Sequence, residues 1–478
     1  MINRYSGIAL GFIRGIYRMR NFMCAAGTFF LCAGFVWAQQ EAITPQKRKI
    51  SVEEAVELAL KNNLSLQASK ITMEKTKRPS DLSWNQFLPV VAVSGSLSGA
   101  NKAAETKVPA GIGPGGAFVY TTSESPRWGM NGAFQIQWQK LNIAMFEGIK
   151  QLKQTYETGQ ITYQKAKFQL ERDIRKLYAS LSLAQESLFV QEQSLALAEE
   201  QVRTAGENYR AGLSPELTLM QARLNRDNLI PVIDQARNNM KVSMANLAVF
   251  MGLPYDTGFD FGSVERADFS LPLDMAMLIN EAASRKIEIQ ELRATIAATR
   301  TARNAMRYQL WTPSVDFGWS YAPVFNGDPF KDDWTGSRWN DRGALSLSLS
   351  WSLNGILPFT TQASNLRDME DTLRGMDVNL AQLINATEVE VYNTVFLISQ
   401  ARESVAAQLK TVELAQKTYE DTLAAFRAGL RDFLEVQNVE QQLRQAQLGV
   451  LQQQFNFLSG IIDLEYAICV PFGTLLNQ

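Results

Sequence analysis

The sequence contains no histidine among its 478 residues. Histidine is the commonest general base and the commonest metal ligand of proteins. Its absence removes the usual basis for acid–base or metal chemistry. No cysteine pair, glycine-rich phosphate loop or acid pair in a plausible pocket takes its place. We therefore expect a protein that is not an enzyme and that holds no catalytic residue, metal or cofactor.

Cysteine and net charge are also low. The three cysteines are Cys24, Cys32 and Cys469, and the formal net charge is −1. A chain this close to neutral has no general electrostatic attraction to nucleic acid, so no nucleic-acid partner is expected. Charged residues make up 20% and apolar residues 46%, both ordinary for folded proteins, which argues against general disorder.

Residues 1–38 have the pattern of a secretory signal peptide. Three arginines form a positive flank: Arg14, Arg18 and Arg20. An apolar stretch follows over 22–37, and short side chains before the end of Ala38 suit signal peptidase, which predicts cleavage after Ala38. The alternative is a retained anchor, but about 16 residues are few for a membrane span. Translation begins at either Met1 or Met19. Cleavage would leave only Cys469, so no disulfide within the chain is expected.

Long apolar runs are missing from the rest of the chain. No run of 18 or more apolar residues follows residue 38, which predicts no transmembrane helix in the mature chain. If the mature chain crosses a membrane, it must do so as strands of a closed barrel, because only there are all backbone groups paired in lipid.

The mature chain repeats itself. The segment Tyr-Arg-Ala-Gly-Leu at 209–213 returns as Phe-Arg-Ala-Gly-Leu at 426–430, and Phe87-Leu-Pro has its counterpart in Trp311-Thr-Pro. The pattern predicts an internal two-fold repeat of helix, strand, strand, long helix, glycine turn and return helix. The first repeat is assigned to 39–252, with strands at 89–98 and 129–141, a long helix at 143–211 and a return helix at 215–251. The second is assigned to 281–468, with strands at 315–322 and 345–353, a long helix at 360–428 and a return helix at 431–467. An equatorial linker at 253–280 and a tail at 469–478 complete the chain.

The four expected strands alternate between apolar and small or polar residues. The segment 345–353 reads Leu-Ser-Leu-Ser-Leu-Ser-Trp-Ser-Leu. Period two places the two sets on opposite faces, as strands of a membrane barrel require. Candidate interfacial aromatics are Trp128, Trp138, Trp319, Tyr321 and Trp351. The alternative is a half-buried soluble sheet, which would need a packed partner. The connections 99–127 and 323–341 are expected as long loops on the extracellular side.

The expected long helices carry an apolar seam with steps of four and three residues, which is typical of coiled coils. Seventy residues correspond to a rod of about 105 Å. The return segment 215–251 stacked on 281–310, and 431–467 stacked on 51–86, would each give about 100 to 110 Å. Gly212 and Gly429 end the long helices, and Ser214 and Asp432 are expected to cap the helices that follow. These hairpins need no further role, but their tips are exposed places for a partner.

Four strands cannot close a membrane barrel, since the smallest have about eight. Several copies must therefore share one barrel; two copies would supply eight strands and three would supply twelve. The fold class expected is an α+β membrane protein, with a four-strand share of a transmembrane β-barrel continued by a long antiparallel coiled-coil helical barrel.

Over about residues 50–468 the sequence resembles the TolC family of outer-membrane efflux proteins. The resemblance is carried by the repeat, the two Pro motifs, the two tip motifs and Phe433-Leu-Glu-Val-Gln-Asn438. It implies a homotrimer in the outer membrane, with a tunnel extending into the periplasm. It also implies a periplasmic adaptor and an inner-membrane pump or secretion ATPase as partners.

The resemblance also implies residue roles. The adaptor would touch the tips at Gly212, Leu213, Gly429 and Leu430. The family's pore constriction carries two acids, whose positions here hold Glu435 and Asn438, so only one carboxylate remains. Arg431 matches a residue that latches the closed entrance, but its acidic partner is replaced by Thr218, so no ionic latch is expected.

The resulting hypothesis is a passive exit duct for efflux or for type I protein secretion. The alternative of another class is a periplasmic coiled-coil scaffold without channel activity.

Overall fold

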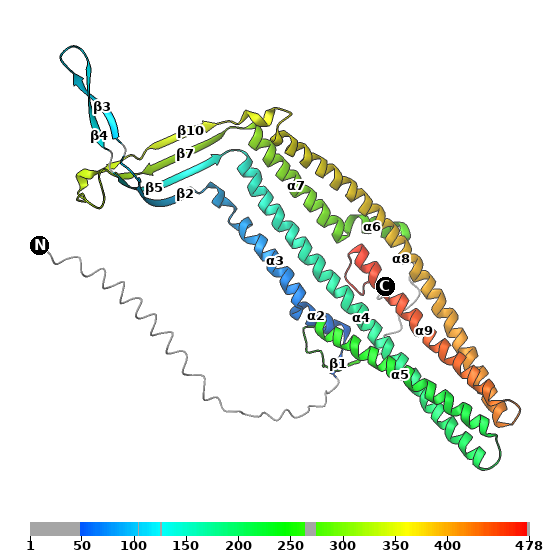
Figure 1. Cartoon of the computed structure of the whole chain (residues 1–478). Helices are drawn as coiled ribbons and strands as arrows, with labels where there is room; N and C mark the ends of the chain where they lie inside the picture. Colours follow the sequence, from blue (N-terminus) through cyan, green and yellow to red (C-terminus); the bar gives the residue numbers. More distant parts are fainter. Residues whose placement is uncertain (1–47, 104, 125–126, 263–273, 476–478) are drawn as a thin grey trace, which may run out of the picture. The chain divides into compact units, whose positions relative to one another are not determined.

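The structure is a computed structural model that describes residues 48–103, 105–124, 127–262 and 274–475. The expected signal peptide lies outside these residues, as do Cys24, Cys32 and part of the expected linker. The described residues belong to one unit, in which strands lead into long helices (Figure 1). None of the helices in these residues is both long enough and apolar enough to span a membrane.

Four long strands form the main part of one sheet. They are β2 (Val90–Gly99), β5 (Trp128–Leu141), β7 (Ser314–Tyr321) and β10 (Leu345–Ser350). They pair antiparallel in the order β2-β5-β7-β10, with the short strands β8 (Pro323–Phe325) and β9 (Trp339–Asp341) added beside β5. The first half of the chain thus contributes two neighbouring strands and the second half contributes the other two.

The strand register gathers the apolar residues on one face. Ile136 is paired with Val91 on one side and with Trp319 on the other, and Trp319 is paired with Leu345. The row formed by Gln135 and its partners Ala92 and Ser320 has small or polar side chains. Because neighbouring side chains in a strand alternate between faces, the sheet has one apolar and one polar face. All residues of β2 and β10 are exposed.

The connections 99–127 and 323–341, expected as long loops, contain strands of their own, and their extracellular position stays a prediction. The first connection contains β3 (Glu105–Ile112) and β4 (Phe118–Glu124), which form a separate two-stranded hairpin. The second contains β8 and β9 and a short 3-10 helix, η2 (Gly336–Arg338). Pro109 and Gly111 lie within β3, where its register with β4 shifts, and the glycines and proline of 113–116 form the turn. Such residues are typical of loops, so the sequence did not indicate the strands on either side of them.

Two helices of 67 residues dominate the rest of the chain: α4 (Ala144–Arg210) and α8 (Thr361–Arg427). At 1.5 Å per residue each is about 100 Å long. The shorter helices are α2 (Val52–Asn62), α3 (Leu64–Asp81), α5 (Glu216–Phe250), α6 (Met275–Arg285), α7 (Ile287–Trp311) and α9 (Phe433–Ile468). Two further 3-10 helices connect helices to strands. η1 (Ser83–Phe87) lies between α3 and β2, and η3 (Leu353–Ile356) lies between β10 and α8.

The expected continuous helices at 51–86 and 281–310 are each interrupted. Asn63 separates α2 from α3, and its side-chain oxygen accepts a hydrogen bond of 3.0 Å from the Leu66 N–H, as an N-cap does. Its side-chain amide also donates to the Phe250 carbonyl at the end of α5, at 3.0 Å. Lys286 separates α6 from α7. Periodicity did not reveal these breaks, because the apolar pattern continues across them.

The return helices do not stack on the segments expected, which were 281–310 for 215–251 and 51–86 for 431–467. The end of α5 meets α2 and α3, where Leu247 and Met240 share an apolar cluster with Ala55 and Leu66. The end of α9 meets α6 and α7, where Phe457 and other α9 residues share a cluster with Leu278 and Ala282. Length alone could not decide the pairing, since each return helix reaches about 100 Å with either partner.

Helix α4 holds the helical layer together. It contacts α2, α3 and α5 on one side and α7 and α9 on the other, while α8 packs against α6, α7 and α9 (Figure 1). Buried seam residues of α4 include Leu170, Ile174, Leu181 and Ala198. Near the middle, β1 (Arg48–Ile50) pairs in parallel with β6 (Phe259–Phe261), and both strands pack against α4. The described part of the expected linker therefore contains a strand.

Gly252 is a tightly constrained turn residue. Its φ is +68°, and a Cβ placed there would lie 2.7 Å from the Asn62 Cβ and 2.8 Å from the Asn62 carbonyl oxygen. We expect Gly252→Ala to lower the free energy of unfolding by about 2–4 kcal/mol, from left-handed strain and overpacking together. The thermal unfolding midpoint in detergent measures this. Gly212→Ala is the matched control, because Gly212 has φ +71° but no atom within 4 Å of such a Cβ. Equal losses in the two variants would contradict the packing argument.

Candidate functional site at the helical tips

Each long helix ends in a glycine turn of the same geometry. Gly212 and Gly429 have φ values of +71° and +76°. The N–H of Leu213 donates to the Asn208 carbonyl at 2.8 Å, and that of Leu430 donates to the Ala425 carbonyl at 2.9 Å. These six-to-one hydrogen bonds define the Schellman motif, which needs a left-handed residue and therefore favours glycine. Both turns are thus satisfied by their own backbone.

The caps expected after the turns are not formed by side chains. Pro215, rather than Ser214, is the N-cap of α5, and it makes no side-chain capping bond. Asp432 is the N-cap of α9 but likewise makes no side-chain capping bond. The extended backbone of both residues starts the helices without this help.

Two leucines stand out from the turns. Leu213 is 77% exposed and Leu430 is 78% exposed. In a Schellman motif the corresponding residue often packs back on the helix, but here neither leucine is covered. Further exposed apolar residues continue along the same helices: Leu217, Met220 and Leu224 on α5, and Leu434 on α9. The tips therefore carry an apolar surface that is available to another protein.

The two helical hairpins, α4–α5 and α8–α9, contact each other just behind the tips. Phe433 at the start of α9 is buried against Ala205 of α4 and against Leu219 and Ala222 of α5. The Phe426 ring of α8 lies 5.8 Å from the Phe433 ring, centroid to centroid. In this structure the hairpins are therefore packed together at the level of the proposed entrance.

The structure brings together two of the four candidate gate residues. The Arg431 guanidinium donates to the Glu435 carboxylate at 2.7 Å, and both side chains are exposed. Asn438 is exposed and Thr218 is half-buried on another helix. Sequence reasoning missed the pairing of Arg431 with Glu435, although their spacing of four residues is that of an ion pair on one helix face.

A buried polar contact lies farther along the same helices. Glu440 of α9 is 5% exposed, and its Oε2 accepts a hydrogen bond of 2.9 Å from Nε2 of Gln201 on α4. Burial raises the pKa of the Glu440 carboxyl. Sequence reasoning missed this residue, although Val436, Glu440 and Leu443 follow the steps of four and three that mark a buried seam.

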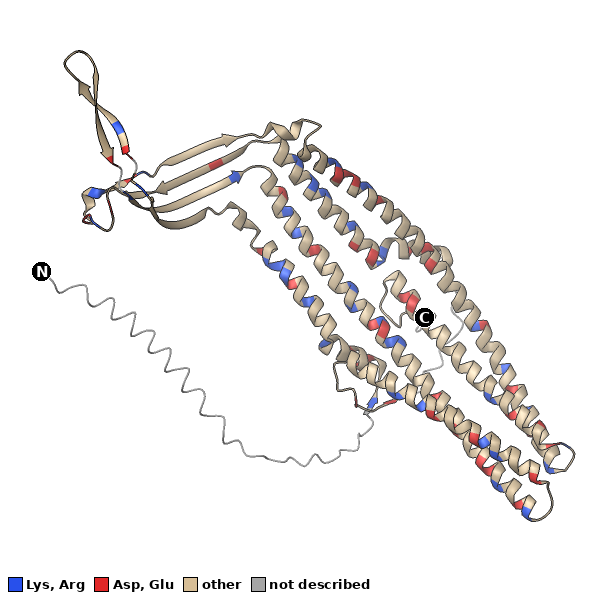
Figure 2. Ribbon diagram, in the orientation of Figure 1, with Lys and Arg blue, Asp and Glu red and all other residues tan. Residues whose placement is uncertain are grey.

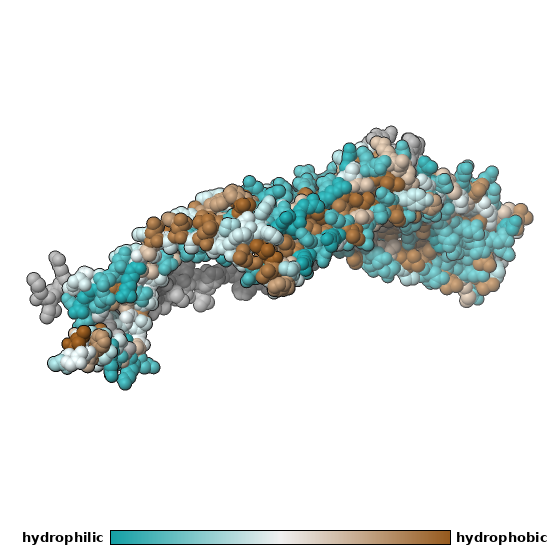
Figure 3. Space-filling model, turned by 90° about the horizontal axis from the view of Figure 1, so that it is seen from above, coloured by the Kyte–Doolittle hydropathy of each residue, from teal (hydrophilic) through white to brown (hydrophobic). Residues whose placement is uncertain are grey.

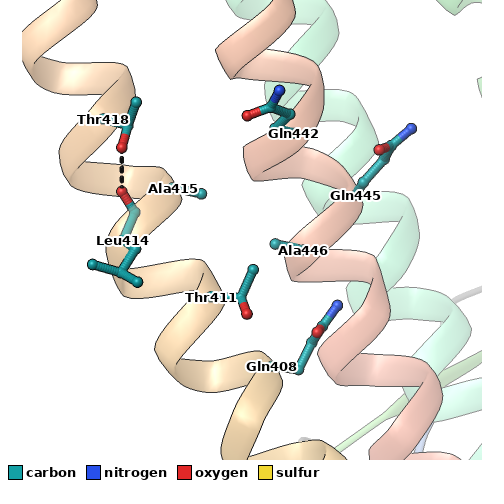
Figure 4. A pocket seen from close by; sticks show the side chains of 8 residues that line it. All are labelled: Gln408, Thr411, Leu414, Ala415, Thr418, Gln442, Gln445 and Ala446. Atoms are coloured by element: carbon teal, nitrogen blue, oxygen red, sulfur yellow. Dashed lines mark hydrogen bonds between the residues drawn. The ribbon is translucent and has the colours of Figure 1, made fainter.

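A surface groove of about 470 Å³ is lined by residues of both α8 and α9 behind the tip. Figure 4 shows the amide side chains of Gln408, Gln442 and Gln445 along it, with Thr411 and Ala415 from α8. The lining has hydroxyl and amide groups and no charged side chain. It can offer hydrogen bonds to a partner but has no group for acid–base chemistry.

The candidate interfacial aromatics that lie within strands belong to the apolar rows of the sheet. Trp128 and Trp138 begin and nearly end β5, and ten residues of strand separate them by about 33 Å. Trp138 donates its indole N–H to the Phe87 carbonyl at 3.1 Å, and the Trp128 ring meets Phe330 edge to face. Trp319 and Tyr321 lie in the interior and at the end of β7, and Trp351 directly follows β10. Their interfacial role stays a prediction.

Charged residues are rare in the four long strands of the sheet. Figure 2 shows Lys, Arg, Asp and Glu spread along the helices, whereas the four long strands contain only Lys140 and Asp316. Apolar residues are exposed on the strands as well as on the helices (Figure 3). In the described ranges no group of three or more acids, cysteines or histidines is placed to hold a metal ion.

Comparisons with known proteins give one family model and several solved structures that are similar. Residues 55–253 match the family model described as "Outer membrane efflux protein". The structure is similar to that of the outer-membrane channel OprN, with a TM-score of 0.70 and 16% identity over 87% of this chain and 89% of that one. It is also similar to the CmeC outer membrane channel of Campylobacter jejuni, with a TM-score of 0.71 and 16% identity over 87% and 85% of the two chains.

A third solved structure is the outer membrane protein VceC of Vibrio cholerae, with a TM-score of 0.70 and 14% identity over 88% of this chain and 96% of that one. At these identities the likeness establishes a shared fold. No curated protein sequence matches the chain significantly.

Proposed function

Because this chain is a member of the outer membrane efflux protein family, we propose that it is the passive exit duct of a tripartite efflux or type I secretion system. Its place is the outer membrane, with the helices extending into the periplasm. It transports and does not catalyse. The energy for transport comes from an inner-membrane pump or secretion ATPase, and the exported compound passes through the lumen of the assembled protein.

The apolar face of the sheet is the observation that carries this proposal. Val93 is 79% exposed and Leu347 is 74% exposed, on strands that the register joins into one apolar surface. A monomeric protein in water rarely exposes such a contiguous surface. Lipid removes its cost, because acyl chains are as apolar as the side chains. The opposite face, with Gln135, Gln137 and Ser320, would then line a water-filled lumen.

The free edges of the sheet support an oligomer. β2 and β10 are the outermost of the four long strands, and within the part of the chain that the structure describes each pairs with a strand on one side only. Unpaired backbone groups are too costly in lipid for an open edge to persist there. We propose a homotrimer, in which β10 of one copy pairs with β2 of the next and twelve strands close one barrel. The exposed apolar residues Val389, Tyr392 and Phe396 of α8 would pack against a neighbouring copy in the same way.

The exposed tips support docking of a periplasmic adaptor. Leu213 and Leu430 are uncovered apolar side chains on turns that their own backbone already stabilises. The neighbouring groove between α8 and α9 adds amide and hydroxyl groups for hydrogen bonding. An adaptor whose own hairpins present apolar residues would bury both leucines.

Conductance of the purified full-length protein in planar bilayers, together with cell fractionation, tests the proposed function. We expect discrete conductance steps and recovery from the outer membrane as a heat-modifiable oligomer. Recovery from the soluble periplasm without conductance would instead support the coiled-coil scaffold.

Lysine substitutions on the two faces of β10 test the assignment of the faces. Leu347→Lys would place a charge on the lipid face, at a cost of about 2–4 kcal/mol near the middle of the bilayer. Ser346→Lys adds the same side chain to the lumen face of the same strand, where water can solvate it. We expect the first variant to lose most of its heat-modifiable oligomer in the outer membrane and the second to keep it. Equal yields would refute the assignment.

Substitutions at the Arg431–Glu435 pair test the entrance. An exposed ion pair is worth about 0.2–1 kcal/mol, so Arg431→Gln, which frees the Glu435 carboxylate, should strengthen block by divalent cations up to about fivefold. Glu435→Gln should weaken the block. Unchanged block in both variants would show that neither residue lines the conducting path.

A further inference from the structure

One carboxylate occupies a position in the helix packing that its neighbours fill with apolar side chains. Glu440 lies between the buried residues Val436 and Leu443 on the same face of α9. Around it, Leu197 of α4 and Tyr419 and Leu423 of α8 form an apolar cluster with these two residues. A charge at such a place loses its hydration, which is costly unless it is paired. A buried Glu440 must therefore be either neutral or paired.

One hydrogen bond joins Glu440 and Gln201, and it uses only one of the two polar atoms at the end of each side chain. The Gln201 Nε2 donates to the Glu440 Oε2 at 2.9 Å. The other oxygen of each side chain, Oε1 of Glu440 and Oε1 of Gln201, is buried and has no hydrogen-bond partner among the described residues. An ionised carboxylate and an amide oxygen are both acceptors only, so they cannot satisfy one another. A buried polar atom left without a partner costs about 1–3 kcal/mol.

One proton removes both defects. If Glu440 carries it on Oε1, that O–H can donate to Oε1 of Gln201 while the existing bond from Nε2 remains. A carboxylic acid and a primary amide pair in this way through two parallel hydrogen bonds, and every polar atom of the pair is then satisfied. Protonation also removes the buried charge.

We propose that Glu440 is protonated in the packed state and that its acid–amide pair with Gln201 is a proton-controlled latch between the two helical hairpins. The pair joins α9 of the second hairpin to α4 of the first. This inference rests on the proposed function for its consequence, which is control of the entrance, whereas the protonated pair itself is a property of the packed helices.

The latch lies close to the tips. Glu440 is seven residues after the start of α9, and Gln201 is nine residues before the end of α4, which places both about 10–14 Å from the turns. The buried contact of Phe433 with Ala205 lies on the turn side of the same interface. Separation of the hairpins at their tips would therefore expose Glu440 to water.

The charged groups near Glu440 affect its pKa less than burial does. Burial is the largest influence and raises the pKa of Glu440; the Gln201 hydrogen bond and the charge of Arg444 on α9 lower it less. From α8, Tyr419 faces it, and its own pKa is raised by burial and by Glu440, against a smaller effect of Arg427. On α4, the neighbours Glu200 and Arg203 are exposed and hydrogen-bond to each other.

The sign of the pH dependence follows from linkage. In the separated hairpins Glu440 is hydrated and its pKa returns towards the ordinary carboxyl value, so the packed state binds the proton more tightly. The latch is then strongest below the ordinary carboxyl pKa and is lost as pH rises through the raised pKa of the packed state. Each unit of difference between the two pKa values favours separation tenfold. Rising pH therefore favours an open entrance.

Infrared spectroscopy of the purified full-length protein tests the protonated pair directly. We expect the carbonyl stretching band of a protonated carboxyl group to persist at a pH at which exposed carboxylates are ionised. Glu440→Gln should remove that band. Glu435→Gln is the matched control on the same helix, because Glu435 is exposed, and it should leave the band unchanged. Absence of a band that depends on Glu440 would overturn the proposal.

The pH profile of conductance tests the control of the entrance. The open fraction of the natural protein and of a Glu199→Gln control, which changes an exposed acid on α4 two residues from Gln201, should rise with pH. Glu440→Gln should remain mostly closed with a flat profile, because two amides keep both hydrogen bonds without titrating. Gln201→Leu should lose the closure at low pH. If Glu440→Gln keeps the natural profile, the latch does not control the entrance. A Glu440-dependent band in a protein that conducts no ions would support the pair and overturn the proposed duct.

Discussion

The backbone groups at the two free edges of the sheet impose the main constraint on this protein. Four long strands are paired with each other, but the outer sides of β2 and β10 present N–H and C=O groups in need of partners. One face of the same sheet is apolar and exposed. Water can satisfy the edges but not that face, and lipid can cover the face but not the edges. A closed ring of identical chains in a membrane satisfies both.

The arrangement of the helices follows from the same requirement. Two strands from each half of the chain lead into one helix of 67 residues, so each half supplies one full-length rod. The second rod of each half is composite, and local contacts hold its pieces end to end. Asn63 does so for the first rod, by capping α3 and binding the end of α5. The hydrogen bond from Tyr466 of α9 to Glu288 of α7 does so for the second. The outer helices keep exposed apolar residues that neighbouring copies can cover.

Much of this architecture could be predicted from the sequence, because its elements are long and strictly periodic. The Leu-Ser alternation of β10 predicts a strand, and the apolar seam of α4 predicts a helix. The glycine of each Ala-Gly-Leu turn could likewise be placed, since a helix end needs a left-handed residue. The internal repeat and the coiled-coil helical barrel stay predictions.

Features that depend on tertiary contacts could not be predicted. The pairing of the composite rods depends on which ends meet, and total length is the same for either choice. The hairpin of β3 and β4 lies among glycines and prolines that read as a loop. At the candidate site, the spacing of Arg431 and Glu435 was visible in the sequence, but their ion pair was overlooked. Glu440 follows the seam spacing, yet only the structure shows Gln201 opposite it and the two oxygens that lack partners.

The mass of the protein extracted from the outer membrane is the most direct test of the shared sheet. One full-length chain has a mass of 53.5 kDa, before any loss of a signal peptide. Native mass spectrometry in detergent should give a single species with the mass of three mature chains, because we propose that three copies close the sheet. A stable species with the mass of one chain, inserted in the membrane and conducting ions, would contradict this account.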